Sequence, residues 1–399
     1  MTNVTKLANL QWLLLIISLV LAIVHFPATI VAQESSASEL TPAPAKTIAD
    51  PKINEKLAEL VKEHKIPGIV AGIVHGNELI AVGAAGVRKL GATELITVDD
   101  KMHLGSCTKA MTSTRIAMLV EEGKLDWNST LASVFPEETA AMHPDYHDVT
   151  LTQLLTHRAS VPANISWILF KPELEWLGPK TSIIEKRLRV LRLALKDKPR
   201  KPPGTEFQYS NVGYVLAGAM AERVTGQAWE DLMQDGLFQP LGMATAGFGP
   251  PGTQGRIDQP WGHVSLFGIP IPEQEDNVPA LGPAGVVHVS IPDWAKFAAL
   301  HLQGARGNAT LLKPETYIRL QTPPENEDYA MGWVVESPAW ASTDGFWHNG
   351  SNTMWYSLLW IFPEKNVALL AVTNQFNVGA CDDAVRFLLE YFETELLQK

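Results

Sequence analysis

The first segment with chemical potential is Gly105-Ser106-Cys107-Thr108-Lys109, in which a serine and a lysine stand three residues apart. If this segment begins a helix, Ser106 and Lys109 share one helical face, and the lysine amine can hydrogen-bond to Ser106 Oγ. A serine hydroxyl is a weak nucleophile until a neighbouring base takes its proton. Free N–H groups at the helix start can also bind a developing oxyanion. The spacing therefore indicates nucleophilic catalysis, although a serine that caps a surface helix would give the same pattern.

A second segment, Tyr209-Ser210-Asn211, follows a Pro-Pro-Gly-Thr turn and precedes a helical run. Its tyrosine can accept and relay the proton of Ser106, provided that a nearby Lys109 cation lowers the pKa of the phenol. The same three residues also fit an ordinary capping turn, which is the structural alternative for this segment.

A third segment, His348-Asn349-Gly350-Ser351, lies between aromatic-rich stretches that are typical of strands. Gly350 has no side chain, so it would let the backbone come close to a substrate. The N–H of Ser351 can then supply a second hydrogen-bond donor to an oxyanion. A histidine on a strand is often a satisfied structural residue, so this segment alone does not establish a site.

In this order, the three segments resemble the motifs of the serine β-lactamase and penicillin-binding-protein superfamily. The similar branch comprises class C β-lactamases, D-alanyl-D-alanine carboxypeptidases and their esterase relatives. The resemblance covers residues 66–374, with supporting stretches at Leu154-Leu155-Thr156-His157, Pro203-Gly204-Thr205, Pro240-Leu241-Gly242-Met243, Pro283-Ala284-Gly285 and Gly332-Trp333. It implies an α+β fold, an antiparallel β-sheet flanked by helices with a mainly helical inserted domain, and a serine hydrolase that forms an acyl-enzyme.

The resemblance implies a catalytic role for four side chains. Ser106 would be the acylated nucleophile and Lys109 its proton partner. Tyr209 would be the general base, which reprotonates the leaving group and activates the deacylating water. His348 occupies the basic position of the third motif. Whether Tyr209 or Lys109 is the operative base stays open at this point, because protonation depends on distances that a sequence does not contain.

The resemblance also implies a substrate-binding group. Asn211 would orient Lys109 and a substrate amide, and the backbone amides of Ser106 and Ser351 would form the oxyanion hole. The expected substrate-binding residues are Asn211, Asn349, Gly350 and Ser351. No cofactor or metal ion is expected, and the expected partner is a small-molecule ester, amide or β-lactam substrate.

Departures from the class C pattern bear on the substrate. Class C enzymes usually carry Lys-Thr-Gly at the third motif, whereas His348 is at best partly charged near neutral pH. Residues 352–355 stand where relatives tend to have glycines, and Met354 and Trp355 either narrow the acyl pocket or, as we favour, pack the sheet. Residues 155–160 lack the usual Ser-Gly. These differences favour a carboxylesterase or D-amino-acid peptidase over a class C-like β-lactamase; a non-catalytic sensor or assembly protein is the alternative of another class.

The surrounding sequence predicts the elements that would hold these groups together. Helical spacing marks 51–64, 108–122, 150–157, 209–225, 229–237 and 381–397, and strand patterns mark 68–74, 79–84, 329–336, 353–362 and 367–373. Strands at both ends with helices between them suggest one antiparallel sheet built from the two termini. We therefore expect a sheet domain of residues 51–105 and 290–399, a mainly helical domain of residues 106–289, and an active site between the two.

The composition limits the possible partners. The 399 residues are 46% hydrophobic, enough for a large core, and the formal net charge is −11. That charge argues against a nucleic-acid binder, because attraction to phosphate needs the opposite sign. The two cysteines exclude a disulfide scaffold, and Cys107 is expected to be a buried thiol. Residues 143–148 have the composition of a metal site, but Pro144 breaks a helical ligand geometry and favours a surface loop.

The N-terminal residues are typical of an export signal. Lys6 precedes an apolar run from 13 to 24, and Ile30-Val31-Ala32 ends in a small residue. This run is short for a membrane span, which needs about 20 residues. We expect residues 1–32 to be a signal peptide, residues 33–50 to be a linker, and the protein to be secreted or periplasmic. An uncleaved anchor, which would keep the protein near a membrane, is the alternative.

Residues 180–201 are locally basic around an apolar stripe of Ile184, Leu188, Leu191 and Leu195. The basic residues expected on the other faces are Lys186, Arg187, Arg189, Arg192 and Lys196. We interpret the segment as an ordinary solvated helix, with a lid or a membrane-contacting helix as the alternative.

Overall fold

The computed structural model describes residues 49–164, 181–308 and 310–397. The predicted signal peptide, residues 1–32, lies outside these ranges, as does the predicted linker except for residues 49 and 50. Within the ranges described, no helix is both long and apolar enough to cross a bilayer.

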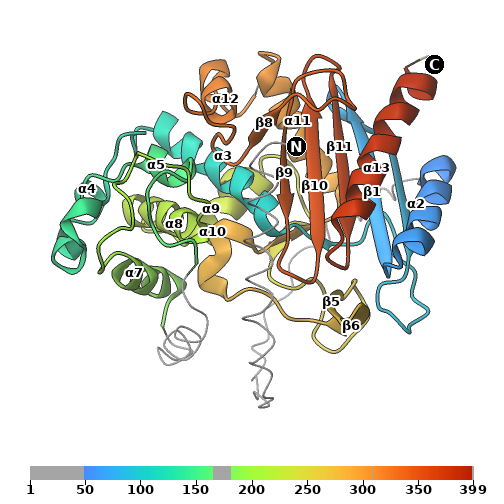
Figure 1. The fold of residues 1–399 in the computed structure, drawn as a ribbon, viewed down its shortest axis with the longest axis horizontal. Helices are drawn as coiled ribbons and strands as arrows, with labels where there is room; N and C mark the ends of the chain where they lie inside the picture. Colours follow the sequence, from blue (N-terminus) through green and yellow to red (C-terminus); the bar gives the residue numbers. More distant parts are fainter. Residues whose placement is uncertain (1–48, 165–180, 309, 398–399) are drawn as a thin grey trace, which may run out of the picture.

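The centre of the fold is a six-stranded sheet in the order β2-β1-β11-β10-β9-β8. Its strands are β1 (Gly68–His75), β2 (Glu78–Gly86), β8 (Val334–Glu336), β9 (Gly345–Gly350), β10 (Tyr356–Phe362) and β11 (Val367–Thr373). All neighbours are antiparallel, and β1 pairs with β11, so the two ends of the described chain share one sheet (Figure 1). The predicted α+β fold with an antiparallel sheet is confirmed.

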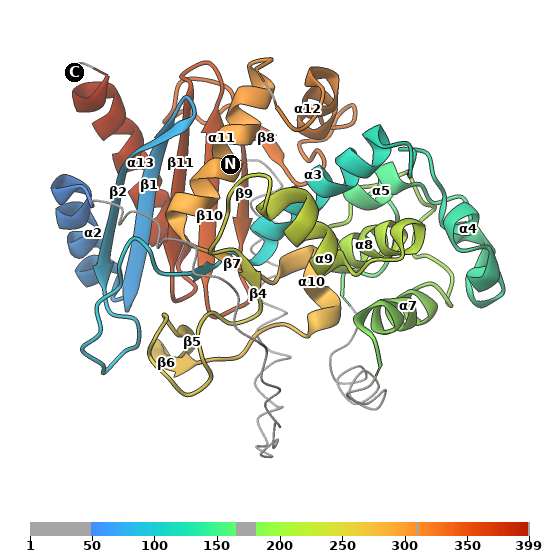
Figure 2. The ribbon, with the colours of Figure 1, turned by 180° about the vertical axis from the view of Figure 1, so that it is seen from behind.

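Helices cover both faces of the sheet (Figures 1 and 2). One face packs against α2 (Pro51–His64) and α13 (Val378–Tyr391), and the other packs against α11 (Ile291–Ala305). The α2 residues Ile53, Leu57 and Leu60 follow helical spacing and are buried in this packing. The C-terminal helix begins earlier than predicted and continues beyond α13 as a π-helical turn, η6 (Phe392–Leu396).

The chain between β2 and α11 is mainly helical. Its helices and first turn are η1 (Gly105–Cys107), α3 (Thr108–Glu121), α4 (Leu131–Val134), α5 (Leu151–Leu155), α7 (Ile183–Ala194), α8 (Asn211–Thr225), α9 (Trp229–Met233) and α10 (Gly282–Gly285). Helix α3 is central, because α8, α9 and α10 all pack against it and nearly all of its side chains are buried. A polar side chain on α3 is therefore surrounded by protein.

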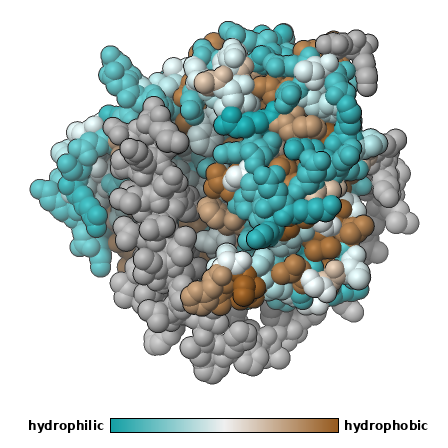
Figure 3. Space-filling model, turned by 45° about the vertical axis from the view of Figure 1, so that its right-hand side comes forward, coloured by the Kyte–Doolittle hydropathy of each residue, from teal (hydrophilic) through white to brown (hydrophobic). Residues whose placement is uncertain are grey.

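Short elements complete the structure. A three-stranded sheet joins β3 (Met102–His103), β7 (Val287–Val289) and β4 (Gly247–Phe248), and a hairpin joins β5 (Gly262–Leu266) and β6 (Ile269–Glu273). The remaining helical turns are α12 (Pro314–Gln321), η2 (Pro136–Ala141), η3 (Pro144–Tyr146), η4 (Gln234–Phe238) and η5 (Pro279–Leu281). Figure 3 shows one face of the molecule, on which hydrophilic residues surround separate hydrophobic patches.

Helix α7 differs from its predicted environment. Arg187, which we expected on a solvated face, is fully buried and ion-paired with Glu222 and Glu230. Leu191 is also fully buried, and α7 packs against α8. A buried cation needs such partners because desolvation of an unpaired charge is costly. The prediction for Arg187 is therefore wrong, whereas Lys186, Arg189 and Arg192 are partly exposed and Lys196 is exposed, as expected for a helix with one face in solvent.

The segment after the third motif is a buried turn. The strand predicted at 353–362 begins only at Tyr356, because Thr353 adopts a left-handed conformation (φ 76°). Met354 and Trp355 are buried in the hydrophobic core. Their favoured interpretation as packing residues is confirmed.

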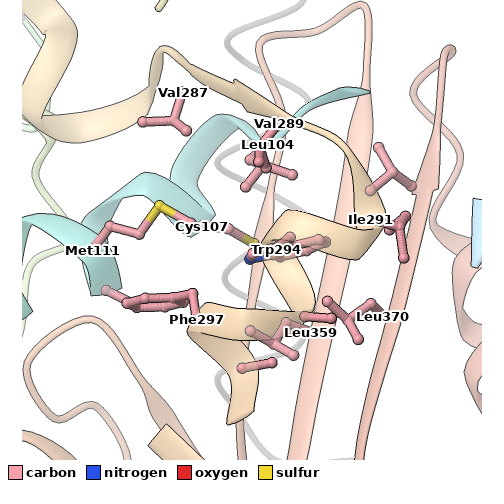
Figure 4. Close-up of a cluster of buried hydrophobic side chains, with 14 of the residues drawn as sticks. Leu104, Cys107, Met111, Val287, Val289, Ile291, Trp294, Phe297, Leu359 and Leu370 are labelled. Atoms are coloured by element: carbon pink, nitrogen blue, oxygen red, sulfur yellow. The ribbon is translucent and has the colours of Figure 1, made fainter. Parts of the chain in front are cut away.

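The core behind α3 includes Cys107. Figure 4 shows Cys107 and Met111 beside Trp294 and Phe297 of α11. Both cysteines are free and buried, as predicted for Cys107. The Cys107 thiol donates to the His348 carbonyl at 3.3 Å and lies 3.2 Å from Ser357 Oγ. Burial raises the pKa of this thiol to about 12, so it stays protonated.

Candidate active site

Ser106 and Lys109 lie where the turn η1 passes into α3. Lys109 Nζ is 3.0 Å from Ser106 Oγ, and the lysine side chain is completely buried. Gly105 precedes the serine with a left-handed φ of 49°, which a glycine adopts without strain. The structure thus brings together the two side chains of the first motif.

The Lys109 amine also has two partners that can only accept hydrogen bonds. Nζ donates to Asn211 Oδ1 at 2.7 Å and to the carbonyl of Ala284 at 2.7 Å. The oxygen of Asn211 faces the amine because Asn211 Nδ2 donates to Asn164 Oδ1 at 2.8 Å. A neutral amine has two N–H groups and one lone pair, so these two acceptors leave the lone pair directed at Ser106 Oγ.

The environment of Lys109 favours this neutral form. Burial lowers the pKa of Lys109 well below its ordinary value. None of its three hydrogen-bond partners carries a negative charge that would hold the amine protonated. A neutral amine beside a serine hydroxyl is able to accept the serine proton.

Tyr209 is the third side chain near Ser106 and Lys109. Its ring centroid lies 4.9 Å from Lys109 Nζ, and Ser106 is among the groups that act on the pKa of its phenol. Burial raises the pKa of Tyr209 above its ordinary value, so the phenol keeps its proton. The prediction that a Lys109 cation lowers this pKa is wrong, because burial dominates and a neutral amine has no charge to offer. A protonated phenol in this place is suited to donate a proton.

His348 faces the helical side of the sheet, and its imidazole is bonded to Tyr329. The Tyr329 hydroxyl lies 3.0 Å from His348 Nε2. Burial lowers the pKa of His348 to about 3. The imidazole is therefore neutral near pH 7, in agreement with the expectation that this position is at best partly charged. The third motif brings no cation to the site at this position.

The backbone at Gly350 touches the backbone at the start of the serine helix. A Cβ at Gly350 would lie 1.9 Å from the Leu104 carbonyl and 2.6 Å from the Ser106 nitrogen, and one at Gly105 would lie 2.2 Å from the Ser351 nitrogen. Gly350 thus permits a close approach to the Ser106 segment, rather than to a substrate as predicted. The Ser106 N–H lies in the first turn of the serine helix, where N–H groups lack a partner within the helix, and the Ser351 N–H lies close to Gly105. These two N–H groups are available to one oxyanion.

The side chain of Asn349, which was predicted to bind substrate, does not lie with the residues around Ser106. Successive side chains on a strand point to opposite faces, so Asn349 faces away from His348 and the serine. Its Nδ2 donates to the Tyr356 hydroxyl at 3.0 Å, beside the cluster packed against α13. The expectation that the Asn349 side chain binds substrate is therefore corrected: its amide is a structural partner of Tyr356.

Sequence reasoning missed several groups around the site. The Ala284 carbonyl belongs to the Pro283-Ala284-Gly285 stretch that supports the family resemblance. Its role as an acceptor could not be predicted, because every residue type has a backbone carbonyl. Asn164 and Tyr329 carry no motif signal at all. The ring of Tyr329 lies 4.6 Å from that of His157 and 6.3 Å from that of Tyr209, so it joins two of the predicted segments.

Residues 143–148 form a turn on the helical region rather than an ion site. They contain η3, in which Tyr146 is buried and the His143 ring accepts a hydrogen bond from the Asp145 N–H. In the described part of the chain, no three side chains of metal-binding type converge.

The antiparallel sheet, the helical region and the serine–lysine pair at their junction define the class of β-lactamase and penicillin-binding folds. The family description Beta-lactamase matches residues 53–390, and the chain belongs to this family. This confirms the resemblance seen in the sequence. Members of the family are usually serine hydrolases that act on β-lactam or peptide substrates.

Similar proteins agree with this assignment. Penicillin-binding protein 4 of Amycolatopsis lactamdurans is 25% identical over 334 residues, which are 80% of this chain and 84% of that protein. The octameric penicillin-binding protein homologue of Pyrococcus abyssi has a TM-score of 0.68 at 23% identity, covering 87% of this chain and 77% of its own. A D-alanine carboxypeptidase of Burkholderia cenocepacia gives 0.67 at 19% identity, covering 84% and 97%. The two structures show a shared fold.

Proposed function

We propose that the protein is a serine hydrolase that forms an acyl-enzyme on Ser106 and acts on small ester or amide substrates, as a carboxylesterase or D-amino-acid peptidase does. The observation that carries this proposal is the setting of Lys109. Asn211 and Ala284 occupy two N–H groups of the buried amine, so that its lone pair is left for Ser106 Oγ. Membership of the Beta-lactamase family supports the same chemistry.

In acylation, Lys109 Nζ takes the proton from Ser106 Oγ as that oxygen bonds to the substrate carbonyl carbon. The carbonyl electrons move to oxygen, where the N–H groups of Ser106 and Ser351 stabilise the negative charge. When the carbonyl re-forms, the bond to the leaving alcohol or amine breaks and the Tyr209 hydroxyl gives the leaving group a proton. Lys109 then returns its proton to Tyr209. Lys109 is thus the base toward the serine, and Tyr209 is the acid toward the leaving group.

Deacylation uses the same groups with water as the nucleophile. Lys109 takes a proton as the water oxygen bonds to the acyl carbon, and the two N–H groups again hold the oxyanion. The bond to Ser106 Oγ breaks, and that oxygen regains a proton from Lys109. The products are the free acid and the original enzyme.

The neutral His348 supports small uncharged substrates. A permanent cation at the third motif would attract a substrate carboxylate, but this imidazole is buried, neutral and bonded to Tyr329. We therefore rank simple esters and amides above β-lactams, whose turnover is the alternative function. A non-catalytic sensor would bind such molecules without turnover.

A covalent probe tests the proposal. A fluorophosphonate should add its mass to Ser106 in the wild type and in the control variant Ser113→Ala. Ser113 lies on α3, as Lys109 does, and its hydroxyl is 3.2 Å from Tyr214 Oη of α8. Ser106→Ala should take up no probe and lose hydrolysis of p-nitrophenyl esters by about 10³-fold or more. Equal hydrolysis by Ser106→Ala would contradict the mechanism. A wild type that binds but turns over no ester, D-Ala-D-Ala peptide or nitrocefin would favour the sensor.

We also propose that the protein is exported, on the basis of residues 1–32. Mass spectrometry of the protein from the periplasm or medium should find a new N-terminus at Gln33. A full-length chain in the membrane fraction would favour the anchor, and a full-length chain in the cytosol would contradict export.

A further inference from the structure

A buried carboxylate, Asp276, lies beside the candidate oxyanion site without belonging to any predicted motif. Its side chain is 3% exposed. One oxygen, Oδ2, is 2.8 Å from His103 Nε2. The other, Oδ1, accepts from Asn352 Nδ2 at 2.9 Å and from the Asn277 N–H at 2.7 Å. Three donors thus converge on one carboxylate, which offers about four acceptor positions.

His103 connects this carboxylate to the serine segment. Its Nδ1 accepts a hydrogen bond from the Gly105 N–H at 3.1 Å, so Nδ1 carries no proton. The proton is therefore on Nε2, which donates to Asp276. The imidazole is completely buried, and both of its nitrogens have partners. Through this ring, Asp276 holds the backbone of Gly105, the residue directly before Ser106.

Asn352 connects the same carboxylate to the other oxyanion donor. Asn352 follows Ser351 directly, and its amide is held at both ends. Nδ2 donates to Asp276, and Oδ1 accepts from the Met354 N–H at 3.2 Å. Asn277 adds a third connection, because its Nδ2 donates to the Gly285 carbonyl at 3.0 Å, next to the Ala284 carbonyl that binds Lys109.

We propose that Asp276 and His103 are positioning residues that set the spacing between the Ser106 and Ser351 N–H groups. This inference rests on the proposed acyl-enzyme function. The two N–H groups come from segments about 245 residues apart in sequence, so contacts between distant parts of the chain must set their spacing. Oxyanion stabilisation depends on donors placed at the correct distance before the reaction. The Asp276 carboxylate, through His103 and Asn352, is connected to both neighbouring segments and so supplies that placement.

The variant Asp276→Asn tests this arrangement with almost no change in volume. If the new amide nitrogen faces His103, the imidazole must move its proton to Nδ1, where it opposes the Gly105 N–H. If the nitrogen faces Asn352, two amide donors oppose each other there. Either orientation disturbs one of the two segments while the apolar packing around it is kept.

The experiment compares Asp276→Asn with wild type and with Asp293→Asn. Asp293 is a buried carboxylate that accepts from Thr245 and Lys296, outside the site described above. With a p-nitrophenyl ester, Asp276→Asn should lower kcat about 10- to 100-fold, part of the loss seen when one oxyanion donor is removed, with KM within about twofold. Asp293→Asn should keep the wild-type kcat, even if its melting temperature is lower than that of Asp276→Asn.

The rate of fluorophosphonate labelling separates this inference from the proposed function. A wild type without label on Ser106 would contradict the proposed function. A labelled wild type with Asp276→Asn labelled at the same rate and with unchanged kcat would overturn this inference alone. If Asp276→Asn does not fold, Asn352→Ala removes one branch only and should lower kcat by about 3- to 10-fold, a fraction of the same donor effect. An unchanged kcat in Asn352→Ala would then overturn it.

Discussion

The two faces of the central sheet are packed by different means. On the face covered by α2 and α13, the buried cluster consists of aliphatic and aromatic side chains. On the other face, where β9 meets η1 and α3, buried polar groups such as Lys109, His103 and Asp276 are joined by hydrogen bonds. Burial of polar groups is costly unless each has a partner. The comparison teaches that both faces are stabilised by an apolar cluster, while the face where β9 meets η1 also holds groups suited to chemistry.

The largest expected effect is a loss of chemistry without loss of the fold. Lys109→Met replaces the buried amine by an apolar chain of similar length and removes the group that we propose as the base toward Ser106 Oγ. We expect kcat for ester hydrolysis to fall by about 10³-fold or more. Steady-state kinetics and thermal unfolding of the same preparation measure both properties. Activity within tenfold of wild type would show that another group accepts the serine proton.

The apolar face should give the opposite result. Leu388 on α13 is fully buried in that layer. Leu388→Ala should lower the free energy of unfolding by about 2–5 kcal/mol, because it removes buried methyl groups and leaves a cavity. The kcat of the folded fraction should stay unchanged. Urea unfolding and active-site titration test this pair of results, and a large fall in kcat would show that the two faces are coupled.

Per titrating group and pH unit, the smallest expected effect is on stability against pH. Among the residues described, burial lowers the pKa of five histidines: well below the ordinary value for His157, to about 3 for His301 and His348, and to about 4 for His263 and His288. Below an unfolded pKa of about 6.5, the unfolded chain binds protons that the folded chain does not. The free energy of unfolding should therefore be highest above pH 6.5 and fall as the pH drops toward 4. Each group contributes up to about 1.4 kcal/mol per pH unit. Denaturant unfolding at pH 7.5, 6 and 5 measures this slope; a flat profile would contradict it.

Periodicity and spacing gave correct predictions where the direction of a side chain is set by the geometry of its own helix or strand. The positions of Ile53, Leu57 and Leu60 predicted the buried side of α2, and the three-residue spacing predicted that Ser106 and Lys109 meet. Strand alternation also limits neighbours, because His348 and Asn349 cannot face the same side of β9. Applying that rule to residues 345–350 would have removed Asn349 from the predicted binding group.

Other features depend on contacts between distant segments. His103 and Asp276 are 173 residues apart and match no motif that we used. The Ala284 carbonyl is a backbone group, and Arg187 looked like a surface residue until its partners Glu222 and Glu230 were placed. The protonation of Tyr209 and His348 depends on burial, which residue types alone do not provide.

The thiol of Cys107 has a mechanical consequence. Cys107 follows Ser106 directly, and its thiol contacts the His348 carbonyl on β9 and Ser357 on β10. A shift of Ser106 along its helix axis would therefore also displace or break the contacts of Cys107 with His348 and Ser357. Since β9 also leads into Ser351, the strand that accepts the Cys107 hydrogen bond also carries one proposed oxyanion donor, so nucleophile and donor share one hydrogen-bonded support.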